Sequence, residues 1–221
     1  MRKGIFITGT DTDIGKTHVA CAIIRILKKR GIDCGVMKPV QCAGEDAKRL
    51  IRSSFSKDEL SLVNPFFSKY PYAPVTAFAK EKIRFSRKKV INIYHKLSMR
   101  HKFMVVEGAG GLIVPITARY RICDLIVDFK LPIVIVARLG LGTINHTLLS
   151  VEYARSKGIK IAGIIFNNLS RRIGASEKMN PRIIKNLSGV PILGRVGYSP
   201  YAIKRKTLSN IDIDISRIIY E

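Results

Sequence analysis

The stretch that decides the fold is Thr8-Gly9-Thr10-Asp11-Thr12-Asp13-Ile14-Gly15-Lys16-Thr17, near the start of the chain. It follows the apolar run 4–8 and precedes a segment of helical period, so it joins a predicted strand to a predicted helix. This is the context of a phosphate-binding P-loop. Gly15 lets the backbone approach phosphate, the Lys16 ammonium reaches the outer phosphates, and the Thr17 hydroxyl is a ligand for Mg²⁺. The spacing departs from the standard motif, because position 10 is threonine and the glycine is at position 9. The alternative is a chance Gly-Lys-Thr, and strand, loop and helix in register count against it.

Short apolar runs rich in β-branched residues alternate along the chain with segments of helical period. The runs occupy residues 4–8, 34–40, 103–107, 133–137, 161–167 and 191–196. Such runs are typical of strands buried on both faces, and helices between them imply right-handed crossovers around a parallel sheet. We therefore predict an α/β, P-loop NTPase-like fold, a mostly parallel sheet with helices on both faces, in one domain over residues 1–221. The stretch 64–85 contains prolines and has no clear period, so we expect a long loop region there.

The composition is that of a globular protein with an excess of positive charge. Of 221 residues, 47% are hydrophobic and 25% are charged, and 39 Lys and Arg against 16 Asp and Glu give a net charge of +23. Such a field attracts polyanions, but the basic residues are spread between apolar segments, which favours solvated helix faces over a nucleic-acid site. The four cysteines form no disulfide or metal spacing, and no apolar run approaches the roughly 20 residues of a membrane span. We expect a cytoplasmic protein with no membrane partner, and the charge alone leaves the identity of its partners open.

A P-loop needs a second acidic group, from another strand end, to complete a Mg²⁺ shell. Glu107 follows the apolar run 103–106 and precedes glycines that leave room for a ligand. Asp46 starts a short helical stretch after Gly44-Glu45. Each has an ordinary alternative, a turn glutamate for Glu107 and a helix-start carboxylate for Asp46.

Two further features lie at predicted element ends. Lys38 ends the strand-like sequence Val36-Met37-Lys38-Pro39-Val40. A lysine at that depth is costly unless it meets an anion, so we expect Lys38 to face the reaction site. The segment 140–146 starts a helix whose exposed N–H groups could hold a carboxylate. We interpret His146, within that segment, as a packed or capping side chain rather than a catalytic one.

Together these motifs resemble the dethiobiotin synthetase family, whose members catalyse the penultimate step of biotin synthesis, and the resemblance runs nearly the full length of the chain. Its marks are the P-loop 9–17, Lys38-Pro39-Val40, Val106-Glu107-Gly108-Ala109-Gly110-Gly111, Gly142-Thr143-Ile144-Asn145-His146 and Gly163-Ile164-Ile165-Phe166-Asn167. The resemblance implies a cyclo-ligase that forms C–N bonds. It would join CO2 to 7,8-diaminopelargonate (7,8-diaminononanoate) and close a ureido ring, with ATP becoming ADP and phosphate.

The resemblance also implies a stepwise mechanism and roles for the matching residues. One amine would capture CO2 as a carbamate, the carbamate would attack the γ-phosphate, and the second amine would displace phosphate from the mixed carbamic-phosphoric anhydride. In the catalytic set, Thr12 and Lys38 would contact the carbamate and Lys16 would stabilise the γ-phosphoryl group. The magnesium ligands would be Thr17, Asp46 and Glu107.

Two binding sets follow from the same resemblance. ATP would be held by the P-loop, the acidic strand end and a purine pocket, through Asp13, Ile14, Gly15, Lys16, Thr17, His18, Asp46, Glu107, Gly108, Ala109, Gly110, Asn167, Asn168, Val196, Gly197 and Tyr198. The amide of Asn167 suits adenine, because it offers both a donor and an acceptor. The diamine would be held by Thr12, Lys38, Cys42, Gly142, Thr143 and Asn145. The helix start at 142–145 would come from the partner subunit and hold the distant carboxylate of the substrate, which implies a homodimer with the substrate site at its interface.

The chain departs from the family pattern at Cys42, where a hydroxyl residue is common and a thiol donates only weakly. The segment between Lys38 and Asp46 is also short, so the assignment of Asp46 depends on where the gap is placed. Two other classes are alternatives: a P-loop switch ATPase of the partition or septum-placing type, and a nucleic-acid-binding ATPase suggested by charge alone. The first class carries a signature lysine early in the loop, whereas position 10 is threonine here.

Overall fold

The computed structural model describes residues 3–170, 172–198 and 211–219. At its centre is a seven-stranded sheet with the order β11-β10-β9-β8-β1-β5-β2. Its strands are β1 Lys3–Gly9, β2 Cys34–Met37, β5 Phe103–Gly111, β8 Ile133–Arg138, β9 Ile161–Asn167, β10 Ile192–Val196 and β11 Ile211–Ile213. All neighbours are parallel except β10 and β11. The predicted mostly parallel α/β sheet is therefore confirmed.

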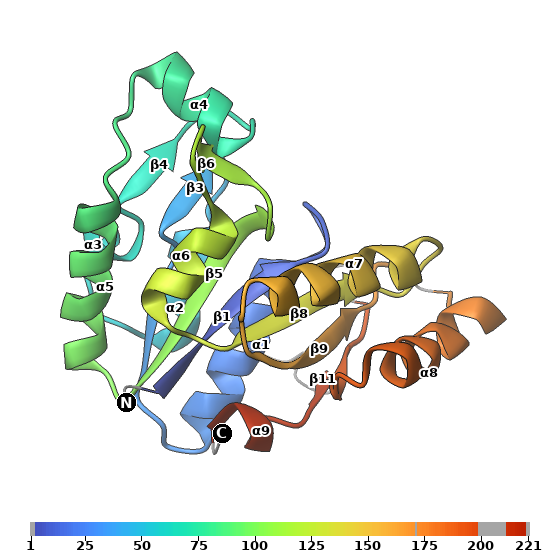
Figure 1. Cartoon of the computed structure of the whole chain (residues 1–221). Helices are drawn as coiled ribbons and strands as arrows, with labels where there is room; N and C mark the ends of the chain where they lie inside the picture. Colours follow the sequence, from blue (N-terminus) through green and yellow to red (C-terminus); the bar gives the residue numbers. More distant parts are fainter. Residues whose placement is uncertain (1–2, 171, 199–210, 220–221) are drawn as a thin grey trace.

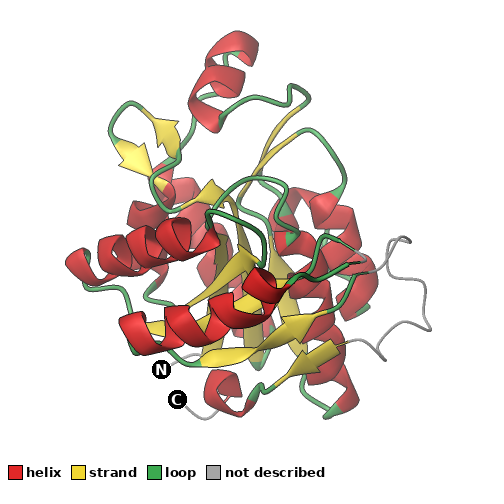
Figure 2. Cartoon of the chain, turned by 90° about the vertical axis from the view of Figure 1, so that its right-hand side faces the viewer, coloured by secondary structure: helices red, strands yellow, loops and turns green. Residues whose placement is uncertain are grey.

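Helices cover both faces of this sheet, as Figures 1 and 2 show. One face packs against α1 Lys16–Lys29, α2 Asp46–Ser54, α3 Leu60–Val63 and α9 Ser216–Ile219. The other packs against α5 Arg87–Arg100, α6 Ile122–Phe129, α7 Thr143–Ser156 and α8 Ala175–Ser188. Side chains alternate along a strand, so Ile5 and Ile7 join the first core while Phe6 joins the second. Burial on both faces is the reason that the strands are continuous apolar runs in the sequence.

A smaller group of elements lies at the top of Figure 1, beyond the upper end of the central sheet. There β3 Val40–Cys42 pairs with β4 Phe66–Ser68, β6 Pro115–Thr117 pairs with β7 Tyr120–Arg121, and α4 Pro74–Glu81 packs against β3, β4 and β6. The expectation of a long loop over 64–85 is therefore wrong. Elements of 3 and 8 residues are too short to show a period. Pro74 does not break a helix here, because it occupies the first turn, where its missing N–H has no partner to lose.

Two strand ends near the P-loop differ from the sequence expectation. The run 34–40 is interrupted, because β2 ends at Met37 and β3 begins only at Val40. Pro39 cannot donate to a strand ladder, which explains the break. β5 in turn continues past Glu107 to Gly111, so Glu107 lies inside the strand rather than at its end.

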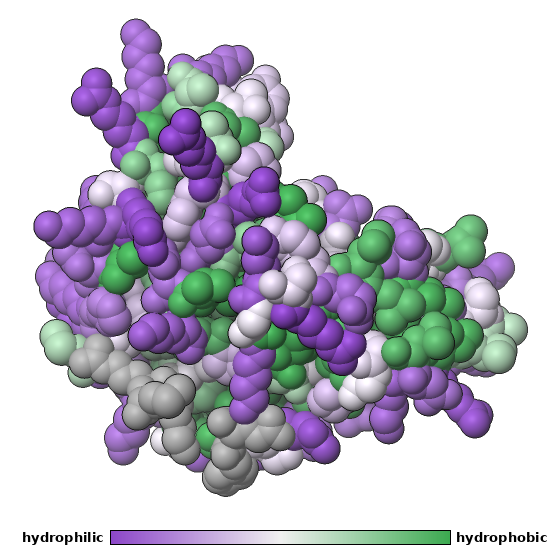
Figure 3. Space-filling view, viewed as in Figure 1, coloured by the Kyte–Doolittle hydropathy of each residue, from purple (hydrophilic) through white to green (hydrophobic). Residues whose placement is uncertain are grey.

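The face of the molecule in Figure 3 carries mostly hydrophilic side chains, with an apolar area over α7 and α8 on the right of the view. Exposed apolar side chains on these helices are Leu149, Met179 and Leu187. In the part of the chain that the structure describes, no helix combines the length and the apolar character that crossing a membrane requires.

Candidate active site

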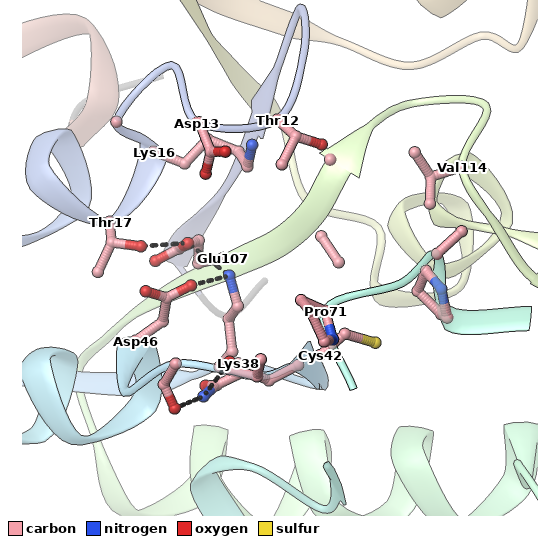
Figure 4. A pocket seen from close by; sticks show the side chains of 18 of the residues that line it. Thr12, Asp13, Lys16, Thr17, Lys38, Cys42, Asp46, Pro71, Glu107 and Val114 are labelled. Carbon is pink, nitrogen blue, oxygen red and sulfur yellow. Dashed lines mark hydrogen bonds and ion pairs between the residues drawn. The ribbon is translucent and has the colours of Figure 1, made fainter. Parts of the chain in front are cut away.

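A cavity of about 620 Å³ lies where the P-loop, β5 and the β3–β4 pair meet (Figure 4). Polar and charged side chains come from the P-loop and β5, and an apolar wall comes from the segment 71–74 and Val114. The residues that line the cavity are Thr12, Asp13, Gly15, Lys16, Thr17, His18, Lys38, Gln41, Cys42, Ala43, Gly44, Asp46, Arg49, Pro71, Tyr72, Ala73, Pro74, Glu107, Ala109, Gly110 and Val114. The cavity therefore brings together four separate stretches of the chain.

The P-loop leaves β1 and turns into α1 at Gly15, whose φ of 85° lies in the left-handed region. A Cβ at this position would collide with the side-chain amide of Asn167. That amide donates a hydrogen bond of 2.8 Å to the Ile14 carbonyl, so the end of β9 holds the loop from behind. Only glycine satisfies both the backbone conformation and this close approach.

Lys16 folds back over the loop that precedes it. Its Nζ donates a hydrogen bond of 2.7 Å to the Asp11 carbonyl. Burial, together with the nearby charge of Lys38, lowers the pKa of Lys16 to about 8. An anion in the cavity would favour the charged form of this ammonium, which is the property that a phosphate-binding lysine needs.

Lys38 and Glu107 form a buried ion pair at the floor of the cavity (Figure 4). Lys38 Nζ lies 2.5 Å from Glu107 Oε1 and 3.0 Å from Asp46 Oδ2, and it donates a further hydrogen bond of 2.9 Å to the Gly108 carbonyl. The Thr17 hydroxyl donates to the same Glu107 oxygen at 2.7 Å. The structure thus brings together all three residues that the sequence predicted as magnesium ligands.

Opposite charges in this cluster offset the effect of burial on each other's pKa. Burial by itself would lower the pKa of Lys38, but the carboxylates of Glu107 and Asp46 outweigh it, and the pKa is raised. Burial would likewise raise the pKa of Asp46, but the Lys38 ammonium outweighs it, and the pKa is lowered. Both groups are therefore charged at neutral pH.

The donor set fits a hard divalent cation. Two carboxylates and one hydroxyl converge, and oxygen is the ligand atom that Mg²⁺ prefers. Glu107 Oε2 is buried and has no hydrogen-bond partner, so this carboxylate keeps an unused acceptor. Among the described residues no group of three or more His, Cys, Asp or Glu side chains could hold a metal ion on its own. A cation here would need phosphate oxygens as well, which is the usual arrangement for Mg²⁺.

Gln41, which sequence reasoning missed, shapes the turn between β3 and α2. Its amide donates to the Ala43 and Gly44 carbonyls at 3.1 and 2.8 Å, and its oxygen accepts from the Ala47 N–H at 2.9 Å. These bonds hold the segment that presents Cys42 to the cavity. Burial raises the pKa of the Cys42 thiol to about 11, so it is neutral near pH 7. A buried glutamine in a strand of three residues carries no sequence signal that could have identified this role.

The apolar wall of the cavity was also missed, because it belongs to the stretch expected to be a loop. Tyr72 stacks on Tyr70, with ring centroids 5.6 Å apart and an interplanar angle of 9°. Lys80 Nζ lies 4.2 Å from the centroid of Tyr70 and 5.3 Å from that of Tyr72. The stack and its cation hold Tyr72 beside the cavity. The prolines at 71 and 74 were the only signal of rigidity that the sequence offered there.

The predicted nucleotide residues fall into two groups. Those lining the cavity are Asp13, Gly15, Lys16, Thr17, His18, Asp46, Glu107, Ala109 and Gly110. Outside its lining are Ile14, Gly108, Asn167, Asn168, Val196, Gly197 and Tyr198. The Asn168 N–H donates to the Val196 carbonyl at 2.9 Å, which ties the ends of β9 and β10 together. Since the Asn167 amide already bonds to the P-loop, its role toward adenine stays a prediction.

The predicted substrate residues also separate. Thr12, Lys38 and Cys42 line the cavity, whereas Gly142, Thr143 and Asn145 do not. Thr143 is buried and its hydroxyl donates to the Arg138 carbonyl at 2.5 Å, while Asn145 is exposed. The contribution of these three residues to a partner subunit's site stays a prediction.

A second hollow, of about 380 Å³, lies between α7 and the outer side of the P-loop. Thr12 and Val114 border both spaces. His146, interpreted from the sequence as packed or capping, is half-buried and lines this hollow together with Leu149 and Tyr153. The hollow therefore lies directly beside the P-loop cavity.

In sequence, the chain matches a family model and is similar to individual known proteins. Residues 3–205 match the family described as an AAA domain. The ATP-dependent dethiobiotin synthetase of Bacillus licheniformis is 39% identical over 227 aligned positions, which cover 96% of this chain and 95% of that protein. The enzyme of the same name from Endomicrobium trichonymphae is 42% identical over 205 positions, covering 90% of this chain and 94% of that protein.

Solved structures resemble the chain in fold. A ParA family ATPase from Chlorobium tepidum superposes with a TM-score of 0.57 at 14% identity, covering 97% of this chain and 92% of that one. The MinD cell division protein of Aquifex aeolicus gives a TM-score of 0.51 at 16% identity, covering 96% and 88%. At these identities the likeness shows the fold alone, and it confirms the predicted P-loop NTPase-like class.

Proposed function

The chain belongs to the dethiobiotin synthetase family, ATP-dependent ligases of biotin biosynthesis, and we propose from this premise that it carboxylates 7,8-diaminopelargonate with CO2 and closes the ureido ring. ATP becomes ADP and phosphate in the same reaction. The observation that supports the proposal most is the convergence of Lys16, Thr17, Lys38 and Glu107 on one cavity at the P-loop. A phosphate-binding lysine and an anion-seeking lysine in one space suit the transfer of a phosphoryl group to a carbamate.

The proposed reaction has three balanced steps. One substrate amine adds to CO2 and loses a proton, which gives an anionic carbamate. A carbamate oxygen then attacks the γ-phosphorus, the bond to ADP breaks, and a mixed carbamic-phosphoric anhydride forms. The second amine attacks the carbamoyl carbon and loses a proton, and the ring closes. Phosphate leaves and carries with it the carbamate oxygen that had attacked the γ-phosphorus.

The residues of this chain would act mainly by position and charge. Thr12 and Lys38 would bind the carbamate, and Lys16 would stabilise the phosphoryl group between its two oxygens. Thr17, Asp46 and Glu107 would hold Mg²⁺, which when bound neutralises charge on the terminal phosphates. The apolar wall at 71–74 would keep water from the anhydride.

The remaining assignments belong to the same proposal. The residues 167–168 and 196–198 would bound the purine, next to the P-loop that Asn167 supports. The helix start at 142–145 would hold the carboxylate of the substrate bound by the other copy in a homodimer. The chain would work as one domain, in the cytoplasm, on small molecules and without a nucleic-acid partner.

The experiment is a mass measurement of the product formed from diamine, bicarbonate, Mg²⁺ and ATP. We expect a product heavier than the diamine by one CO less two hydrogens, with one ADP for each product. With bicarbonate labelled in heavy oxygen, and short reaction times, one labelled oxygen should appear in phosphate, because the anhydride oxygen comes from CO2. Product without label in phosphate would exclude the anhydride, and ADP release without any product would exclude the synthetase activity.

A further inference from the structure

Lys38 occupies the space between the two carboxylates that the proposed function assigns to the metal. Its Nζ contacts Glu107 Oε1 at 2.5 Å and Asp46 Oδ2 at 3.0 Å. Mg²⁺ binds oxygen at about 2.0–2.1 Å, so an ion held by both carboxylates needs the same space as the ammonium. The two cations therefore exclude each other.

The hydrogen bonding of Glu107 is uneven in a way that points to a missing ligand. Its Oε1 accepts from both Lys38 and Thr17, whereas its buried Oε2 has no partner. Glu107 is 0% exposed, so bulk water does not supply the missing hydrogen bond to Oε2. A buried carboxylate oxygen without a partner is costly, and a cation that binds both oxygens of Glu107, taking the place of Lys38 on Oε1, would remove that cost.

We propose that Lys38 is the internal counter-ion of the metal site, which pairs with Asp46 and Glu107 and is displaced into the cavity when Mg²⁺ binds. This inference rests on the metal site of the proposed function. After displacement the ammonium loses its two carboxylate partners, and the nearest use for its charge is the anionic carbamate in the same cavity. The metal then takes the place of Lys38, and the displaced Lys38 becomes available to bind substrate. Binding of the metal and binding of the substrate should therefore each increase the affinity for the other.

The test uses Mn²⁺ as the probe, titrated into nucleotide-free protein and followed by electron paramagnetic resonance. Lys38→Met removes the competing charge and keeps the length of the side chain. We expect Mn²⁺ to bind this variant at least about tenfold more tightly than it binds the wild type. A neighbouring charge of this kind shifts the pKa of an ionisable group by one unit or more, and the same free energy changes the affinity for a metal ion about tenfold. Without metal its melting temperature should fall below that of the wild type, and Mn²⁺ should close the gap.

Lys48→Met is the matched control. Lys48 lies on α2, two residues after Asp46, and its ammonium pairs at 3.0 Å with Glu45 on the exposed side of the helix. The substitution makes the same chemical change near the site without touching either metal carboxylate. Its Mn²⁺ affinity should equal that of the wild type.

The double variant Lys38→Met, Glu107→Gln keeps the experiment decisive if the single variant folds poorly. Removing the buried charge together with its partner should restore stability without metal. Equal Mn²⁺ affinity in Lys38→Met and wild type would overturn the exchange, as would a single variant that stays unfolded at saturating Mn²⁺. If either outcome is found but the wild type binds Mn²⁺ in the presence of ADP, the proposed metal site is retained and only the displacement of Lys38 is rejected. Absence of Mn²⁺ binding with ADP in wild type would reject the metal site itself.

Discussion

Lys16 illustrates how one buried charge is kept available for a ligand. Its ammonium donates a hydrogen bond to the Asp11 carbonyl, and its pKa is lowered to about 8, chiefly by burial. Lys16→Ala should lower kcat/KM by about 10²–10³-fold, the cost of losing one preorganised charged donor in a transition state. The free energy of unfolding should change by no more than about 1 kcal/mol, the contribution of one hydrogen bond. Lys29→Ala, at an exposed position on the same helix, is the control, and near-normal turnover in Lys16→Ala would remove the P-loop from the mechanism.

Lys38 and Cys42 differ in charge although both line the cavity. A charge-assisted contact contributes roughly 1.5–3 kcal/mol and a neutral one about 1 kcal/mol, so the ammonium should dominate carbamate binding. Lys38→Met should severely impair dethiobiotin formation. Cys42→Ser should be tolerated or should slightly lower KM for the diamine, since a hydroxyl is the better donor. Steady-state rates at saturating ATP and varied diamine measure both, and the opposite ranking would contradict this position of the carbamate.

At the scale of elements, the P-loop depends on the end of β9 behind it. Gly15 and Gly31 both have left-handed φ, 85° and 72°, but only Gly15 has a close neighbour, the amide of Asn167. Gly31→Ala should therefore cost about 1–2 kcal/mol of stability through backbone strain alone and keep full activity. Gly15→Ala should in addition weaken ADP binding, measured by calorimetry, because the loop must move. ADP affinity in Gly15→Ala equal to that of Gly31→Ala would show that the collision does not displace the loop.

The loop before α3 is fastened to the end of α5 by a buried carboxylate. Burial would raise the pKa of Asp58, but hydrogen bonds from Ser56, His101 and Arg100 outweigh it, and the pKa is lowered. Its stabilisation is therefore complete above the unfolded pKa, near 4, and is lost as pH falls through the lower folded value. Asp58→Asn should cost about 1–3 kcal/mol at pH 7, and the difference from wild type should shrink below pH 4 in urea unfolding. Glu152→Gln, in an exposed ion pair, should show neither effect.

At the scale of the whole molecule, the exposed apolar surface next to the P-loop suits a second copy of the chain. Ile113 and Leu149 are 54% and 61% exposed and line the hollow between α7 and the P-loop. Burying such side chains is what a dimer interface gains. Leu149→Glu should yield a monomer in light scattering and should raise KM for the diamine. Met99→Glu, at a position 68% exposed on α5, should leave the oligomeric state unchanged, and a monomeric wild type would reject the homodimer.

The sequence by itself determined the features that depend on consecutive residues. The alternation of apolar runs and helical periods specifies a buried parallel sheet, because burial on both faces demands such runs. The order strand, loop, Gly-Lys-Thr, helix identifies Lys16 and Thr17 with no tertiary information, since the motif is local. Glu107 followed in the same way from its position after four apolar residues.

Only the tertiary structure decided how distant segments meet. Lys38 and Glu107 are 69 residues apart in the sequence, yet their side chains are in contact at 2.5 Å, and the same contact makes Lys38 a competitor for the metal carboxylates. Gln41 and Tyr72 act through partners that no local pattern specifies, and the short elements within 64–85 are stable only where they pack on one another. Local propensity sets which elements form, whereas the positions of side chains in a site depend on packing between elements far apart in sequence.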